Sequence, residues 1–190
     1  MFMPYVIEKT GRSQKPMDLP SRLLQDRIVH ISGPITPELA DIVKMQLVWL
    51  NNDDPSSRIQ LWINSPGGCV YSGRSIKDVI DYIDAKVDTI GTGMCASMGA
   101  YLLASGTGNR KATKRCRIMV HSVSSGHEGT YHDLKVNFKE TEYLQDEIIQ
   151  EIAHFTKGKT DYSEMNRLCE RDYYMSSKQA LTLGLIDKVV

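Results

Sequence analysis

Apolar positions along the chain follow two periods, one typical of strands and one typical of helices. Apolar runs predict strands at residues 28–31, 59–63, 87–90 and 117–120. Between the first two runs, Thr36 precedes Pro37, which is a capping residue followed by a proline at the first helical position. Apolar residues then recur every three or four positions as far as Leu50. This segment is therefore predicted to be an amphipathic helix.

Further helices are predicted wherever the helical spacing returns. They cover residues 72–82, a segment that opens near Ser97, residues 131–156, residues 162–168 and a segment from Ser177. Strands and helices thus alternate at the spacing of right-handed crossovers, which predicts an α/β fold with a parallel sheet covered by helices. The helix over residues 131–156 is longer than one small sheet can cover, so part of it should project and pack on a neighbouring subunit.

Two polar segments are expected to lie outside the core. Residues 1–20 are rich in turn formers and should have little core of their own. Residues 109–115 form a strongly basic turn, which we interpret as a solvated loop rather than a nucleic-acid site.

Composition excludes several classes of function. Lysine plus arginine number 23, as do aspartate plus glutamate, so no net field favours nucleic acid or an anionic membrane. The cysteines Cys69, Cys95, Cys116 and Cys169 form no C-x-x-C pair, which favours free thiols in a reducing compartment. The apolar start of the chain is too short for a signal peptide or a membrane span. We expect a soluble, cytoplasmic protein with no metal or other cofactor.

The strand at residues 87–90 leads into a glycine-punctuated turn and then a helix of small residues, with Ser97 at its start. Backbone N–H groups at a helix start lack intrahelical partners and favour developing negative charge, which suits the nucleophile of an acyl transfer. Such a serine needs a base and an orienting group, and His121 and Asp172 are the candidates. A serine in this place can also simply cap the helix, and spacing alone does not show that the three side chains converge.

A second candidate element is Pro66-Gly67-Gly68, which follows the strand at residues 59–63. Glycine lets the backbone approach a substrate closely and reach positive φ. An oxyanion site needs N–H groups aimed at one point, and those of Gly68 and Met98 would form the pair. Alone, Pro-Gly-Gly is only a turn signal.

Together these segments resemble the Clp protease family over nearly the whole chain. The matching stretches are Ser21-Arg22-Leu23-Leu24, Ile63-Asn64-Ser65-Pro66-Gly67-Gly68, Ala96-Ser97-Met98-Gly99-Ala100, Met119-Val120-His121, Glu170-Arg171-Asp172 and Ala180-Leu181-Thr182-Leu183-Gly184-Leu185-Ile186-Asp187. The resemblance implies one crotonase-like domain over residues 21–190, built of repeated β-β-α and βαβ units. It also implies a protruding handle helix at about residues 131–156 and an axial-pore segment at residues 1–20.

The activity implied by the resemblance is that of a serine endopeptidase, the core of an ATP-dependent protease that degrades unfolded polypeptides to short peptides. Ser97 would be the nucleophile, His121 the general base and Asp172 the orienting acid. Gly68 and Met98 would donate to the oxyanion. No cofactor is implied.

The resemblance further implies two stacked heptameric rings, made of this chain alone or mixed with related subunits, and an AAA+ unfoldase of the Clp type docked outside. Glu170 and Arg171 would lie at the ring–ring contact. The surface that docks the unfoldase would include Val48, Gln60, Trp62 and Tyr82. No G-x-x-x-x-G-K-[ST] motif is present in the sequence, so we expect the partner to bind ATP.

The chain departs from the family pattern at several positions. Pro20 stands where a tyrosine is usual, which leaves the path out of the pore segment open. Ser122-Val123 follows His121 in place of Gln-Pro, which leaves the geometry of the substrate loop open. Gln60 stands where an aromatic residue is usual in the docking surface, which leaves the choice of partner open.

Two other functions fit parts of the pattern. A non-catalytic or regulatory ring subunit would share the fold, but such relatives usually lack one or more of the three residues, and Ser97, His121 and Asp172 are all present. Crotonase-like enzymes use a similar pair of backbone donors to stabilise a thioester enolate, but they do not need these residues as a set. An assay of peptide hydrolysis and an assay of acyl-CoA hydration would distinguish the protease from a crotonase-like enzyme.

Overall fold

The fold is described from a computed structural model, which covers residues 4–10 and 13–190. Within these residues a seven-stranded sheet has the order β3-β4-β5-β6-β9, with β7 paired to β5 and β8 paired to β7. The strands are β3 (Ile28–Ser32), β4 (Ile59–Ser65), β5 (Val87–Ala96), β6 (Arg110–Ala112), β7 (Arg117–Val120), β8 (Tyr173–Ser176) and β9 (Lys188–Val189). The pairing of β7 with β8 is antiparallel and the others are parallel. The predicted parallel sheet is confirmed, with β8 as an antiparallel addition.

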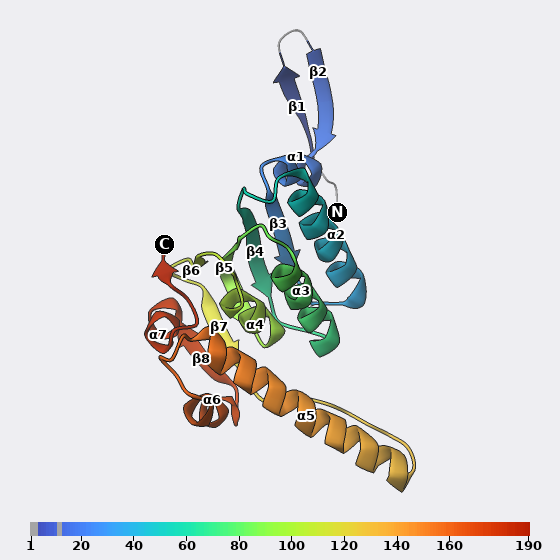
Figure 1. The fold of residues 1–190 in the computed structure, drawn as a ribbon, viewed down its shortest axis with the longest axis vertical. Helices are drawn as coiled ribbons and strands as arrows, with labels where there is room; N and C mark the ends of the chain where they lie inside the picture. The colour runs from blue at the N-terminus through green and yellow to red at the C-terminus, as the bar shows by residue number, and fades with distance from the viewer. Residues whose placement is uncertain (1–3, 11–12) are drawn as a thin grey trace.

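Seven helices of the described residues connect the strands. They are α1 (Leu19–Gln25), α2 (Pro37–Asp53), α3 (Val70–Tyr82), α4 (Met98–Ala104), α5 (Tyr131–Phe155), α6 (Tyr162–Cys169) and α7 (Ser177–Leu183). Figure 1 shows α2, α3 and α4 on the same face. Along β4, Ile59, Leu61 and Ile63 are fully buried in the core that these helices share, whereas Gln60 points to the other side and is exposed. The alternation of the strand thus decides which face the helices cover.

The strand β5 is longer than its apolar run predicts. It continues past residue 90 to Ala96, because its second half pairs in parallel with β7. In this pairing Ala96 lies opposite Met119. The extra length brings Ser97 to the level at which β7 ends.

The N-terminal segment forms a hairpin that the sequence did not predict. The strands β1 (Tyr5–Thr10) and β2 (Ser13–Asp18) pair antiparallel, outside the main sheet, and the hairpin projects at one end of the molecule (Figure 1). Tyr5 and Ile7 are exposed, which agrees with a segment that has little core of its own. The pore-lining role of residues 1–20 stays a prediction, and residues 1–3 and 11–12 lie outside the described part.

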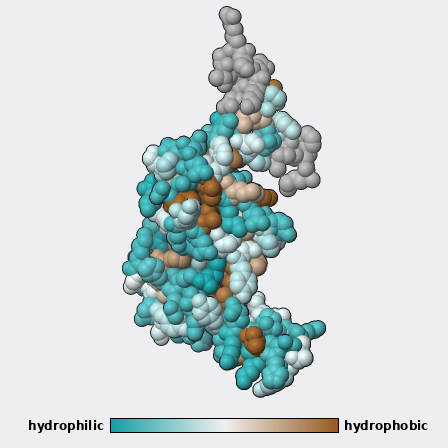
Figure 2. Space-filling view, turned by 45° about the vertical axis from the view of Figure 1, so that its right-hand side comes forward, coloured by the Kyte–Doolittle hydropathy of each residue, from teal (hydrophilic) through white to brown (hydrophobic). Residues whose placement is uncertain are grey.

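The long helix α5 agrees closely with its predicted bounds. It begins with a capping box, in which the Thr130 side chain accepts from the backbone N–H of Asp133 and the Asp133 side chain accepts from that of Thr130. Its buried residues lie in its second half, and Figure 1 shows its first half projecting from the body. Apolar side chains at Leu134, Val136 and Phe138 are exposed there, and Figure 2 shows a hydrophobic patch on the projecting end.

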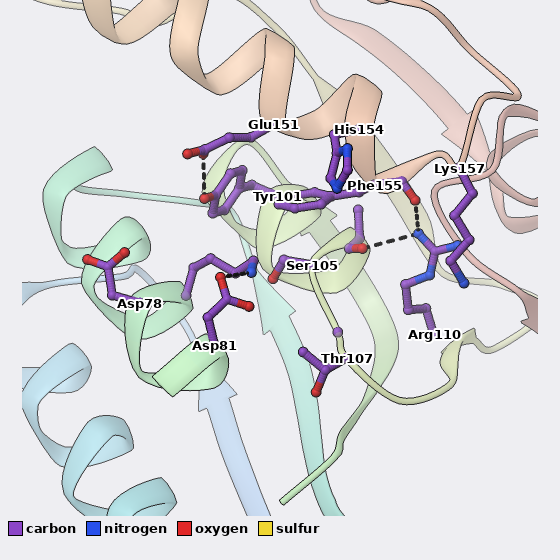
Figure 3. A pocket seen from close by; sticks show the side chains of 13 residues that line it. Asp78, Asp81, Tyr101, Ser105, Thr107, Arg110, Glu151, His154, Phe155 and Lys157 are labelled. Carbon is purple, nitrogen blue, oxygen red and sulfur yellow. Dashed lines mark hydrogen bonds and ion pairs between the residues drawn. The ribbon is translucent and has the colours of Figure 1, made fainter. Parts of the chain in front are cut away.

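The interpretation of residues 109–115 as a solvated loop was wrong at Arg110. This residue belongs to β6, and its side chain is only 2% exposed. It makes a two-pronged ion pair with Asp187, through Nε at 3.0 Å and Nη2 at 2.6 Å. Its Nη1 donates to the carbonyl oxygens of Ala104 and Phe155, at the ends of α4 and α5 (Figure 3). A guanidinium suits this place because helix C-termini carry unpaired carbonyls and partial negative charge.

Replacing Asp187 by asparagine should leave this buried guanidinium without its charged partner. We expect Asp187→Asn to lower the free energy of unfolding by about 2 to 3 kcal/mol at neutral pH, measured by urea denaturation. Asp41→Asn is the control, because the Asp41 side chain is 66% exposed in its pair with Lys44 and its loss should change this energy by less than about 0.5 kcal/mol. Equal effects of the two changes would contradict the structural role of Arg110.

The same pair predicts a dependence of stability on pH. The hydrogen bonds from Arg110 hold the pKa of the Asp187 carboxyl well below its usual value. The folded chain therefore binds fewer protons at this group than the unfolded chain, whose carboxyl titrates near about 3.9. The stabilisation is complete above that pH and declines as the pH falls below it, so the difference between wild type and Asp187→Asn should shrink in acid.

Candidate active site

Ser97 lies at the sharp turn between β5 and α4. Its φ is 54° and its ψ is −124°, a conformation that non-glycine residues adopt only when their surroundings enforce it. Its backbone N–H donates to the Met119 carbonyl at 2.9 Å, and its carbonyl accepts from the N–H groups of Ala100 and Tyr101. The hydroxyl makes no capping bond to the helix. The alternative that Ser97 only caps α4 is therefore wrong.

The hydroxyl instead meets His121. The distance from Ser97 Oγ to His121 Nε2 is 2.9 Å, within hydrogen-bonding range. His121 follows the end of β7, and Ser97 follows the end of β5, which is paired in parallel with β7. The two side chains meet because parallel neighbours present their carboxyl ends at one edge of the sheet.

Asp172 lies on the far side of His121, immediately before β8. Its Oδ1 is 3.7 Å from His121 Nδ1, which is an ion-pair distance rather than a hydrogen bond, and its side chain is 60% exposed. The order of groups is therefore Ser97, His121, Asp172, with the last contact long. Catalytic hydrogen bonds are often long in the absence of substrate.

The Gly67-Gly68 turn packs directly against the serine. Gly67 has a φ of 100°, and a Cβ there would lie 2.6 Å from Ser97 Cβ. Gly68 has a φ of 154°, and a Cβ there would lie 2.3 Å from the Ile35 carbonyl oxygen. Only glycine fits at either position.

The backbone hydrogen bonds of this turn indicate the direction of the Gly68 N–H. Ile35 N–H donates to the Gly67 carbonyl, and Cys69 N–H donates to the Ile35 carbonyl. In such a parallel bridge the N–H of Gly68, between them, points away from Ile35. Met98 is the first residue of α4, where N–H groups lack intrahelical partners. Both predicted oxyanion donors line one cavity with Ser97 and His121.

That cavity has a volume of about 50 Å³ and largely apolar walls. The apolar side chains include Val70 of α3, Met98 of α4, Val120 of β7, and Ile148 and Ile152 of α5. The chain after His121, residues 122–124, closes one side. A small apolar group therefore fits beside the serine.

Two side chains of α5 bind groups on neighbouring elements, and the sequence did not indicate either; of their partners, Val123 lines this cavity. Glu140 accepts a hydrogen bond from the Tyr71 hydroxyl at 3.0 Å, and Gln145 accepts one from the Val123 backbone N–H at 2.7 Å. The sequence signal that could have indicated Gln145 is its position. It is a polar residue three positions before Ile148, on the face of α5 that turns toward the core.

A larger cavity of about 440 Å³ lies between α3, α5 and the far end of α4 (Figure 3). On its wall the Tyr101 hydroxyl donates to Glu151 at 2.6 Å, and burial together with this bond raises the pKa of Tyr101. Its lining residues include Ala104 at the end of α4 but not Ser97 before its start. This cavity shares Tyr101 with the small cavity beside Ser97, but Ser97, His121 and Asp172 do not line it.

The other predicted sites are placed as follows. Glu170 and Arg171 are exposed beside Asp172 and share a shallow hollow with it. Gln60 and Trp62 lie on the sheet face away from the helices, where Trp62 Nε1 donates to Gln60 Oε1 at 3.2 Å.

Val48 lies on the outer side of α2, beside Met45 and Trp49, and Tyr82 is 84% exposed at the end of α3. Within one chain the helices that carry Val48 and Tyr82 thus lie on the opposite side of the sheet from Gln60 and Trp62. The roles of these residues in docking and in ring contact stay predictions.

Among the described residues, no histidine, cysteine, aspartate and glutamate side chains gather in a group of three or more that could hold a metal ion. Over the same part of the chain, no helix combines the length and the apolar character needed to cross a membrane.

Comparison with known proteins agrees with this geometry. The sequence profile of the family described as Clp protease matches residues 11–190. The ATP-dependent Clp protease proteolytic subunit of Deinococcus radiodurans is 44% identical over 191 aligned positions, which cover 99% of this chain and 92% of the relative. The α/β architecture with its parallel sheet is that expected of the family. The chain belongs to the Clp protease family and is a protease.

Proposed function

We propose that this chain is the serine endopeptidase core of an ATP-dependent Clp protease, cutting unfolded polypeptides into short peptides through an acyl-enzyme. The observation that carries the proposal is the 2.9 Å contact between Ser97 Oγ and His121 Nε2, made by a hydroxyl that does not cap its helix. A serine becomes a useful nucleophile when an adjacent base accepts its proton.

In the proposed mechanism Ser97 Oγ attacks the peptide carbonyl carbon while His121 Nε2 takes the hydroxyl proton. The same proton then passes to the leaving amine as the peptide C–N bond breaks, which leaves an ester on Ser97. Water, deprotonated by His121, hydrolyses this ester and restores the serine. Asp172 holds the imidazole in one tautomer and stabilises its charged form, which requires the 3.7 Å contact to shorten by about 1 Å in the working complex.

The oxyanion of each tetrahedral intermediate would be bound by the N–H groups of Gly68 and Met98. The outward direction of the Gly68 N–H and the unpaired helix start at Met98 support this assignment. Donors fixed in place before the reaction stabilise the developing charge without reorganisation, and losing one typically costs about a hundredfold to a thousandfold in rate.

We further propose that the chain assembles into two stacked heptameric rings, in which the projecting half of α5 packs across the ring–ring contact and the β1–β2 hairpin lines the pore. The exposed Leu134, Val136 and Phe138 support the first role, because a projecting helix with an apolar surface needs a partner to cover it. An ATP-driven unfoldase of the Clp type is the proposed partner, and the cytoplasm is the proposed location.

Removal of the Ser97 hydroxyl tests the mechanism. We expect Ser97→Ala to lower the rate of fluorogenic peptide cleavage by at least about a thousandfold, because no other group replaces the nucleophile. A fluorophosphonate probe should label the wild type at Ser97, located by mass spectrometry, and should not label the variant. Ser163→Ala, an exposed serine on α6, is the control. Cleavage by Ser97→Ala at the wild-type rate would refute the assignment.

The apolar cavity beside Ser97 predicts a preference for the residue that precedes the cut. Peptides with leucine or methionine there should be cleaved with a kcat/KM at least about tenfold above that of the matched aspartate peptide, because Val70, Ile148 and Ile152 offer a carboxylate no hydrogen bond. Initial rates on a matched peptide series measure this. Equal rates would show that this cavity does not receive the side chain.

The proposed ring contact is tested at Arg171. Arg171→Ala should shift the assembly toward single rings on a sizing column, because an exposed charged group beside Asp172 is lost from the contact. Arg167→Ala is the matched control, since Arg167 pairs with Glu164 within α6. An unchanged double ring in Arg171→Ala would remove this role.

A further inference from the structure

The chain directly after His121 is held by side chains from distant elements. Residues 121–128 belong to no helix or strand, so their backbone groups need other partners. The Val123 N–H donates to Gln145 Oε1 of α5 at 2.7 Å. The Ser122 hydroxyl donates to the Cys169 carbonyl at the end of α6, also at 2.7 Å. The first of these bonds fixes the backbone itself.

The bond to Gln145 lies at the candidate active site. Val123 and Ser124 line the same small cavity as Ser97. Ile148 and Ile152 line it from α5, and they follow Gln145 by three and seven positions, on the same face of the helix. One face of α5 therefore forms the apolar wall of the cavity and also holds the chain that closes it.

The backbone N–H at position 123 needs an acceptor. Val123 packs against the core, so its N–H is drawn away from water. A valine has a backbone donor, and a donor left unpaired in a buried place is costly. Gln145 supplies the acceptor, and its side chain is itself partly buried.

We propose that Gln145 is a positioning residue for proteolysis, which acts through Val123 to hold residues 122–124 as the edge along which a substrate backbone lies. The inference rests on the proposed function. In an extended segment consecutive N–H groups point to opposite sides. The proposal takes residues 122–124 as extended when substrate is bound, so that a Val123 N–H bound to α5 leaves the backbone groups of Ser124 facing away from α5. An extended peptide can pair with backbone groups presented in this way.

The decisive variant is Gln145→Met, which keeps the length of the side chain and removes the acceptor. We expect kcat/KM for a fluorogenic peptide of several residues to fall about 5- to 30-fold, mainly through a higher KM. The rate of fluorophosphonate labelling at Ser97 should stay within about twofold of wild type, because this small probe does not need the peptide edge. A structural defect of the whole site would lower both.

Two further variants separate the hydrogen bond from other effects. Gln145→Glu retains an acceptor oxygen, and we expect its kcat/KM to stay within about threefold of wild type. Gln150→Met changes an exposed glutamine on the same helix and should behave as wild type. Hydrogen exchange followed by mass spectrometry gives a readout independent of activity, and the peptide that contains Val123 should exchange faster in Gln145→Met alone.

An unchanged KM in Gln145→Met, or equal impairment of Gln145→Glu and Gln145→Met, would overturn the proposal. If the wild type neither cleaves peptides nor labels at Ser97, the proposed function fails first. Hydrogen exchange then still decides on the contact, because unchanged exchange at Val123 in Gln145→Met would show that Gln145 does not hold this segment.

Discussion

The parallel pairing of β5 with β7 is the constraint on which the candidate active site depends. It continues to the last residue of β5, where Ala96 lies opposite Met119, and the Ser97 N–H then donates to the Met119 carbonyl. Ser97 is thereby held at positive φ, level with the end of β7, which His121 follows directly. A strained conformation persists only where several contacts enforce it. Here the strand pairing, the start of α4 and the close approach of Gly67 enforce it together.

The helix α5 is the second organising element, because Ile148 and Ile152 line the small cavity and Gln145 binds the chain that borders it. Gln145 accepts from the Val123 N–H, two residues after His121, and Glu140 accepts from the Tyr71 hydroxyl of α3. Catalytic groups work best when a rigid element fixes their supports.

Arg110 fixes the ends of the helices that build this region. Its guanidinium joins the last carbonyls of α4 and α5 to Asp187, close to the C-terminus of the chain. A buried ion pair is weak evidence for net stability, because desolvation offsets much of the attraction. Its geometry is nevertheless demanding, since every partner must lie in one place. The helix that begins after Ser97 and the helix that carries the cavity wall are thus held at a fixed distance from each other.

The sequence by itself determined four strands of the main sheet, most of the helices and the chemical types at the site. The Thr36-Pro37 cap, the period of α5 and the turn before Ser97 are local signals, and each predicted its element. The tertiary structure decided which side chains, far apart in the sequence, come into contact. Ser97 and His121 lie 24 positions apart, and Arg110 and Asp187 lie 77 positions apart. In the sequence, Arg110 resembles a loop residue and Gln145 resembles any polar residue of a helix. Their partners, Asp187 and Val123, are known only from the tertiary structure. Local patterns record what a segment prefers, whereas sheet register and helix packing select its distant partners.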